Sequence, residues 1–105
     1  MDNILKKEKD FNKVFKSGKR VFSDTVTLYY LPAKEFKVGF AVSKKHGTSV
    51  KRNRIKRLLR EAFRSFSFEN NPEFFFVILP KVAEDYTLEG FKKGIYKVLK
   101  KSGVI

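Results

Sequence analysis

The pattern of hydrophobic positions predicts that the chain begins with a short helix. Between about Lys7 and Lys16, hydrophobic residues recur at the i, i+3, i+4 spacing that places side chains on one helical face. Gly18 follows, and glycine is a frequent residue at the end of a helix. The residues on the hydrophobic face are Phe11, Val14 and Phe15.

Two strands are predicted next, because apolar and polar residues alternate in two further segments. The first runs from Thr25 to Leu31 and is closed by Pro32, and the second runs from Lys37 to Ser43. In the second strand, Gly39 and Ala41 share one face. Their small size leaves space for another element to approach the sheet closely.

The remaining pattern predicts helix, strand and helix. A full helical stripe of apolar residues extends from about Val50 to Phe66. After a predicted turn at Asn70-Asn71-Pro72, the run Phe74 to Leu79 is apolar on both faces, as in an interior strand. A last helix is predicted from about Leu88 to Lys101, with Gly103 as its stop. We therefore expect residues 1–105 to form one α+β sandwich domain.

Composition adds a strong positive charge to this picture. The 105 residues include 24 Lys and Arg against 11 Asp and Glu, a formal net charge of +13, while 42% of residues are hydrophobic. A folded domain with such a field attracts polyanions, nucleic acid first. The chain has no Cys and one His, which excludes disulfide frameworks, thiolate chemistry and the usual zinc sites.

Membrane and secretion signals are absent from the pattern. The longest apolar run, Phe74 to Leu79, is far shorter than the roughly 20 residues that span a bilayer. The first residues lack the apolar core of a signal peptide. We expect a cytoplasmic protein with no membrane partner, and no protein partner is evident.

The longest predicted helix separates its charged face from its apolar face. Residues 44–64 hold nine basic residues and one acid, Glu61. Cations four residues apart, such as Lys56 and Arg60, repel each other, and a face exposed only to solvent usually mixes both signs. A phosphate-binding face is therefore favoured over the alternative of a solvated one. Its residues, about 100° to 200° from Ile55 on a helical wheel, are Asn53, Lys56, Arg57, Arg60 and Arg64.

This region resembles the protein subunit of bacterial ribonuclease P. The run Arg52-Asn53-Arg54-Ile55-Lys56-Arg57-Leu58-Leu59-Arg60 resembles that family's signature helix, and Lys44-Lys45-His46-Gly47 resembles the loop before it. The likeness covers essentially the whole chain. Ser49 stands where alanine is usual and is a suitable helix N-cap. His46 stands where an aliphatic residue is usual, and we expect it in a surface loop.

The resemblance implies that an RNA subunit, with Mg²⁺, performs the catalysis and removes the 5′ leader from precursor tRNA. The protein would be a non-catalytic subunit, inactive alone, that lowers the Mg²⁺ requirement. The implied fold is ribosomal protein S5 domain 2-like: a mixed, mainly antiparallel sheet of about four strands, three helices and a left-handed βαβ crossover. The residues implied to bind the ribonuclease P RNA are Arg52, Asn53, Arg54, Lys56, Arg57, Arg60 and Arg64. Those implied to line a cleft for the leader are Phe11, Phe15, Tyr29, Lys44 and Lys45.

The aromatic residues fit this implied role on chemical grounds. Phe11 and Phe15 lie one turn apart, so both rings can face the same strand, and stacking on aromatic rings accepts any unpaired base. The alternative is that both rings simply pack in the core. Exposed rings would count against a second class of function, a structural RNA-binding protein such as a ribosomal protein, which needs no substrate cleft.

A third class, a self-sufficient nuclease, requires an acid–base pair or a carboxylate cluster for Mg²⁺. The eleven acids are scattered, with Glu84-Asp85 the only adjacent pair, and His46 has no evident partner. No catalytic residue and no protein-bound metal site is therefore assigned.

Overall fold

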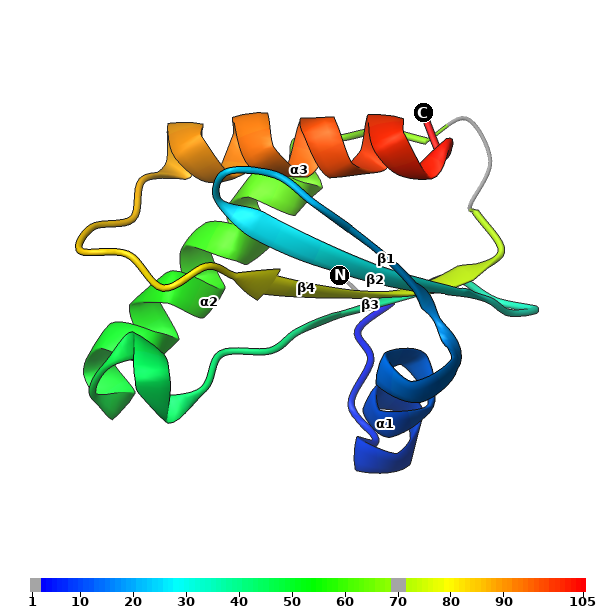
Figure 1. Ribbon diagram of the computed structural model, residues 1–105, viewed down its shortest axis with the longest axis horizontal. Helices are drawn as coiled ribbons and strands as arrows, with labels where there is room; N and C mark the ends of the chain where they lie inside the picture. Colours follow the sequence, from blue (N-terminus) through cyan, green and yellow to red (C-terminus); the bar gives the residue numbers. More distant parts are fainter. Residues whose placement is uncertain (1–2, 69–71) are drawn as a thin grey trace.

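A four-stranded sheet separates α1 from α3 (Figure 1). The computed structural model describes residues 3–68 and 72–105. In chain order the elements are α1 (Glu8–Ser17), β1 (Lys19–Phe22), β2 (Val26–Pro32), β3 (Lys37–Phe40), the 3-10 helix η1 (Lys44–His46), α2 (Ser49–Arg64), β4 (Phe74–Pro80) and α3 (Leu88–Ser102). No helix in these two ranges has the length and apolar character needed to cross a membrane.

The strand order is β1-β2-β4-β3. The β1/β2 and β2/β4 pairs are antiparallel, whereas β3 and β4 are parallel. The predicted mixed, mainly antiparallel sheet and the three helices are confirmed. Because α2 connects the adjacent parallel strands β3 and β4, the chain forms a βαβ crossover; its left-handed sense stays a prediction.

One face of the sheet carries the main core. Alternate residues of β2 and β4, such as Leu28, Phe76 and Ile78, have no exposed surface on this face. They pack against the apolar stripes of α2 and α3, which explains why both stripes were visible in the sequence. The helical residues buried there are Ile55, Leu59, Ala62, Phe63, Phe91, Ile95, Val98 and Leu99.

The other face of the sheet is covered by α1 and by Leu5 in the segment before it. Val14 of α1 is fully buried against Val77 of β4 and Leu5. Phe11 lies over Gly39, where an added Cβ would overlap the phenylalanine ring. The predicted close approach to Gly39 is therefore confirmed, and the approaching element is the first helix.

Three local predictions are corrected by the structure. Residues 19–22 form β1, which was not predicted because its side chains are mostly exposed and show no apolar alternation. Thr48, not Ser49, is the N-cap of α2, and its Oγ1 accepts a hydrogen bond from the Lys51 amide. The strand predicted to reach Ser43 ends at Phe40. Of the predicted turn at 70–72, Asn70 and Asn71 lie outside the described residues.

Candidate nucleic-acid interface

The open part of the sheet lies beside α1, where two aromatic rings meet. Phe15 of α1 contacts Tyr29 of β2 edge-to-face, with ring centroids 4.9 Å apart and planes at 86°. Phe15 is 37% exposed, and Phe11 and Tyr29 are half-buried. Each ring therefore packs on the sheet and still keeps exposed surface, and its contact with a leader stays a prediction.

A hollow of about 280 Å³ lies between α1, the end of β3 and α2. Phe11 lines it from one side and the half-buried Lys56 of α2 from another. The hollow is mainly apolar, so it suits the flat face of a base, with a cation available for the adjoining phosphate. Its lining residues are Phe11, Phe40, Ala41, Val42, Ser43, His46, Lys56 and Leu79.

A second hollow of about 320 Å³ lies beside the first and shares Leu79 with it. Tyr29 lines it, together with Phe22, which is 50% exposed. The Arg20 guanidinium lies 5.6 Å from the centroid of the Phe22 ring, and Lys81 Nζ lies 5.4 Å from it. We call the two hollows together the sheet groove. Aromatic rings and free cations alternate along it, as in sites for single-stranded nucleic acid.

Of the residues that line the second hollow, only Tyr29 is predicted from the sequence. Arg20 and Phe22 belong to the unpredicted strand β1, and the antiparallel register places Arg20 opposite Tyr29. Lys81 is held beside β2 by a hydrogen bond from its amide to the Thr25 carbonyl, at 2.9 Å. Only pairing between distant segments brings these cations to the groove, so no local pattern could have identified them.

Lys44 and Lys45 are exposed on η1, directly beside His46, which lines the groove. The expectation that His46 lies on the surface is wrong: it is 7% exposed. Its Nε2 donates to the Pro80 carbonyl at 2.8 Å, and its Nδ1 accepts from the Ser43 amide at 3.1 Å. Both ring nitrogens are therefore used in joining the loop before α2 to the end of β4.

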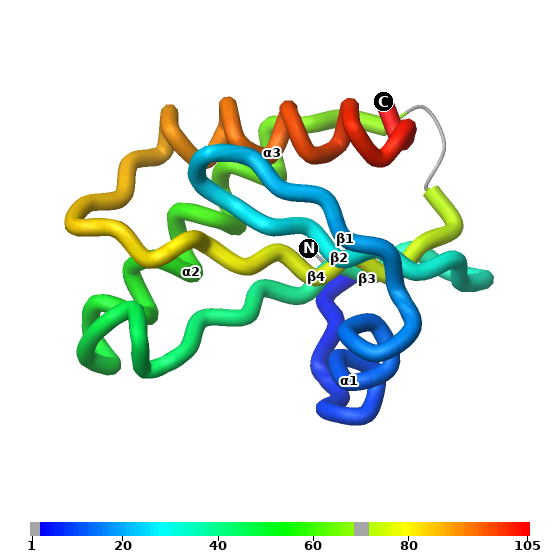
Figure 2. The backbone as a smooth tube through the Cα atoms, in the orientation of Figure 1, coloured from blue at the N-terminus to red at the C-terminus, as the bar shows by residue number. Residues whose placement is uncertain are grey.

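These two loops extend beyond the same end of the sheet (Figure 2). The turn from η1 into α2 depends on Gly47, whose φ of 120° is rarely adopted by other residues. Thr48 then starts the helix. The two lysines and the first turn of α2 are in this way held by backbone geometry and by the buried histidine.

The basic face of α2 carries exposed cations with no acidic partner. Arg57, Arg60 and Arg64 are exposed on this face together with Asn53. Within residues 3–68 and 72–105, the two ion pairs are Lys37–Glu35 and Lys97–Asp24, and neither involves α2. Uncompensated arginines on one face provide bidentate donors for phosphate.

The other two arginines of the signature run lie beside this face rather than on it. Arg52 is half-buried, and its Nε is a buried donor without a hydrogen-bond partner in the described part of the chain. Its Nη2 donates to Ser49 Oγ at 3.3 Å. Arg54 is exposed about 60° beyond Arg57 around the helix. A ligand that contacts all the predicted residues must therefore wrap around α2 from its first turn to its last.

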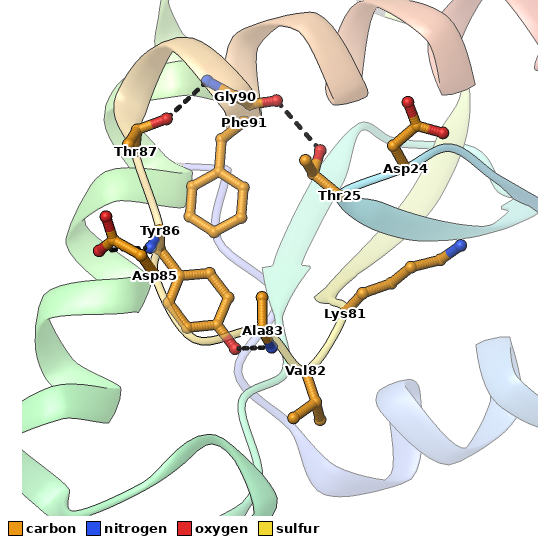
Figure 3. A pocket seen from close by; sticks show the side chains of 10 residues that line it. All are labelled: Asp24, Thr25, Lys81, Val82, Ala83, Asp85, Tyr86, Thr87, Gly90 and Phe91. Carbon is orange, nitrogen blue, oxygen red and sulfur yellow. Dashed lines mark hydrogen bonds between the residues drawn. The ribbon is translucent and has the colours of Figure 1, made fainter.

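A pocket of about 220 Å³ lies at the start of α3, and several of the polar groups that line it are hydrogen-bonded to one another (Figure 3). Thr25 donates to the Gly90 carbonyl, and the Tyr86 hydroxyl accepts from the Ala83 amide. Asp24 and Asp85 stand on opposite sides of the pocket (Figure 3). Across the described ranges, no three His, Asp or Glu side chains gather in a way that could hold a metal ion.

Comparison with known proteins places this geometry in context. The family model described as ribonuclease P matches residues 1–103. The ribonuclease P protein component of Bacillus velezensis is 39% identical over 105 residues, covering 97% of this chain and 90% of the relative. That of Listeria innocua is 38% identical over 105 residues, covering 96% and 88%.

Solved structures agree with the fold. The RNase P protein of Staphylococcus aureus matches with a TM-score of 0.82 and 28% identity, covering 97% of this chain and 96% of the other. The RNase P protein of Thermotoga maritima matches with a TM-score of 0.80 over 92% and 94% of the two chains. At 24% identity, the second likeness concerns the fold alone.

Proposed function

Because the chain belongs to the ribonuclease P protein family, and so is the protein component of that ribonucleoprotein endoribonuclease, we propose that it binds two RNAs with two surfaces. The sheet groove binds the unpaired 5′ leader of precursor tRNA. The basic face of α2, together with Arg52 and Arg54, binds the RNA subunit. The protein acts in the cytoplasm, where we expect this processing to occur.

The observation that carries the leader assignment is the exposed Phe15–Tyr29 pair. Phe15 contacts Tyr29 edge-to-face and is itself 37% exposed, and Tyr29 lines the second hollow with its two cations. Unpaired bases stack on such rings without regard to sequence, which suits a leader that differs among precursor tRNAs. A purely structural RNA-binding protein has no need for a groove of this kind.

The groove also offers a path for the leader across the sheet. From the first hollow at Phe11 and Lys56 the path crosses Leu79 and continues past Tyr29 to Phe22. Lys44 and Lys45 lie on η1 beside His46 at the first end, and Arg20 and Lys81 flank the second. We propose that cations at both ends hold the leader phosphates while the aromatic residues contact its bases.

In this proposal Mg²⁺ is bound mainly by the RNA subunit. The described residues bring no three carboxylate or imidazole groups together, so the proposal assigns Mg²⁺ mainly to the RNA subunit and derives no step from a protein-bound ion. What the chain contributes is positive charge. By neutralising phosphates of the RNA subunit and the leader, it lowers the Mg²⁺ concentration that the RNA needs.

The test is cleavage of a 5′-extended precursor tRNA at low Mg²⁺, using a bacterial ribonuclease P RNA with and without this protein. We expect strong stimulation only when RNA and protein are both present, and no cleavage by the protein alone. Tight, salt-sensitive RNA binding without stimulation would support a structural RNA-binding protein instead. Cleavage by the RNA-free protein would support a self-sufficient nuclease.

A further inference from the structure

The outward side of α3 is a second strongly basic surface. α3 lies on the opposite side of the sheet from α1 (Figure 1), and it carries five lysines and one acid, Glu89. Glu89 lies in the first turn, seven residues and about 10 Å of helix rise before Tyr96. The lysines are Lys92, Lys93, Lys97, Lys100 and Lys101.

Tyr96 lies in the middle of these lysines and is 48% exposed. Its ring stacks on Phe66, just beyond the end of α2, with centroids 6.4 Å apart and planes at 16°. Lys100 Nζ lies 5.8 Å from the centre of the tyrosine ring. The ring is thus held in one orientation by Phe66, while about half of its surface remains available.

Two of the five lysines have partners within the chain. Lys97 pairs with Asp24 at 3.5 Å, and Lys101 Nζ donates to the Phe22 carbonyl at 2.7 Å. Lys92, Lys93 and Lys100 have no acidic partner among the described residues. The first two lie one turn before Tyr96 and the third lies one turn after it, so cations are available on both sides of an exposed aromatic ring.

Packing alone explains the contact of Tyr96 with Phe66 but not the surrounding charge. A leucine would cover Phe66 without exposing an aromatic ring, and lysines at i, i+4 such as Lys93 and Lys97 repel each other. Solvated helix faces usually mix acids with bases. A polyanion with flat, unpaired bases complements both features, because it brings phosphates to the lysines and a stacking partner to the ring.

We propose that the outward face of α3 around Tyr96 is a separate binding surface for single-stranded RNA. One unpaired base stacks on Tyr96, and the flanking phosphates bind Lys93 and Lys100. This surface is distinct from the sheet groove, which lies across the sheet, and from the basic face of α2. The protein therefore contacts RNA from a third direction.

The test is an NMR titration of the full ¹⁵N-labelled chain with a 12-nucleotide oligoadenylate. Backbone amides of α3 report binding at the proposed surface, and amides around Phe15 and Tyr29 report binding in the sheet groove. We expect saturable shifts at Tyr96 and its neighbours. Silence on α3 with shifts in the groove would overturn this inference and leave the proposed function intact, whereas the reverse result would support the inference and weaken the leader assignment.

Two matched variants separate direct binding from an indirect effect. Tyr96→Leu keeps the apolar contact with Phe66 but removes the ring face, so binding followed at the Lys93 and Lys97 amides should weaken roughly 5- to 150-fold. Phe15→Leu removes the ring that packs on Tyr29 of the groove and should leave the α3 shifts unchanged. Loss of the α3 shifts in Phe15→Leu, or their full retention in Tyr96→Leu, would refute stacking on Tyr96.

Salt dependence tests the phosphate contacts. Replacing Lys93 and Lys100 together by glutamine should reduce the slope of log affinity against log salt concentration by roughly 1.4 units, because each phosphate contact to a single strand contributes roughly 0.7. The affinity is again taken from the α3 amides. An unchanged slope would show that neither lysine binds a phosphate.

Discussion

The two faces of the sheet differ in how completely they are covered. On one face, α2 and α3 seal a continuous core of 16 buried residues. On the other, α1 buries a cluster of three, Leu5, Val14 and Val77, and leaves aromatic and apolar residues half-buried around it. The same strands β2 and β4 contribute alternate side chains to both faces.

The difference shows how a small protein separates stability from binding. The sealed face supplies most of the apolar burial and therefore most of the stabilisation. The open face has only one short helix to cover it, so the groove remains accessible and its aromatic residues keep exposed surface. Substitutions on the first face should chiefly change the free energy of unfolding, and those on the second should chiefly change RNA affinity.

The largest effect is expected on the sealed face. Phe63 is 2% exposed and lies near the rings of Phe36 and Phe40. Phe63→Ala should lower the free energy of unfolding by about 3–5 kcal/mol, because it leaves a cavity in the core. Urea unfolding followed by circular dichroism measures this change. Phe15→Ala on the open face is the matched control, and an equal loss there would contradict the division between the faces.

The junction between α1 and the sheet should be sensitive to a single methyl group. Gly39→Ala places a Cβ against the Phe11 ring and should destabilise the protein by about 1–3 kcal/mol through overpacking. Leader affinity should fall as well, because α1 must move. Combining Gly39→Ala with Phe11→Ala relieves the overlap. The double variant should therefore lose less unfolding free energy than the two single variants lose in sum. Strict additivity would show that the two residues do not interact.

Phe15 should separate affinity for the leader from stability. Phe15→Ala should weaken holoenzyme binding of precursor tRNA by about 1–3 kcal/mol if one base stacks on the ring. Binding of mature tRNA, which lacks the leader, should not change. Fluorescence titration of both RNAs gives the comparison. Equal weakening of the two would mean that Phe15 does not contact the leader.

The smallest effect is expected on the basic face of α2. Arg57→Ala should flatten the salt dependence of binding to the RNA subunit by roughly one unit of slope, with little change in stability, because Arg57 is exposed. Lys34→Ala, an exposed cation between β2 and β3, is the control and should leave the slope as it is. If both variants behave alike, Arg57 makes no specific phosphate contact.

Elements whose side chains cover or fill the core were predictable from the sequence. α2 and α3 showed helical stripes because one side of each is buried, and β4 was apolar on both faces because it lies between β2 and β3. β1 had no such signal. Three of its four residues are exposed, and it is held mainly by backbone pairing with β2, which leaves no local pattern.

The candidate site was predictable where the resemblance or the helical spacing identified it. Phe11 and Phe15 and the arginines of α2 belong to that group. Phe22 and Lys81 do not, since strand register and a loop hydrogen bond bring them to the groove. His46 was placed on the surface because a polar loop residue is usually exposed. The Pro80 carbonyl, which accepts from its Nε2, is 34 positions away in sequence and could not be foreseen.

The strand order has a consequence for synthesis on the ribosome. β4 is the last strand to be made, yet it lies in the middle of the sheet between β2 and β3. Until it leaves the ribosome, β3 lacks its strand partner, and the backbone bridge that remains among the described residues joins Ile4 and Val38. The sheet depends on these distant pairings, which form late and slowly. Leu79, which links the two hollows of the groove, arrives with the same strand, so the groove is complete only after β4 has paired.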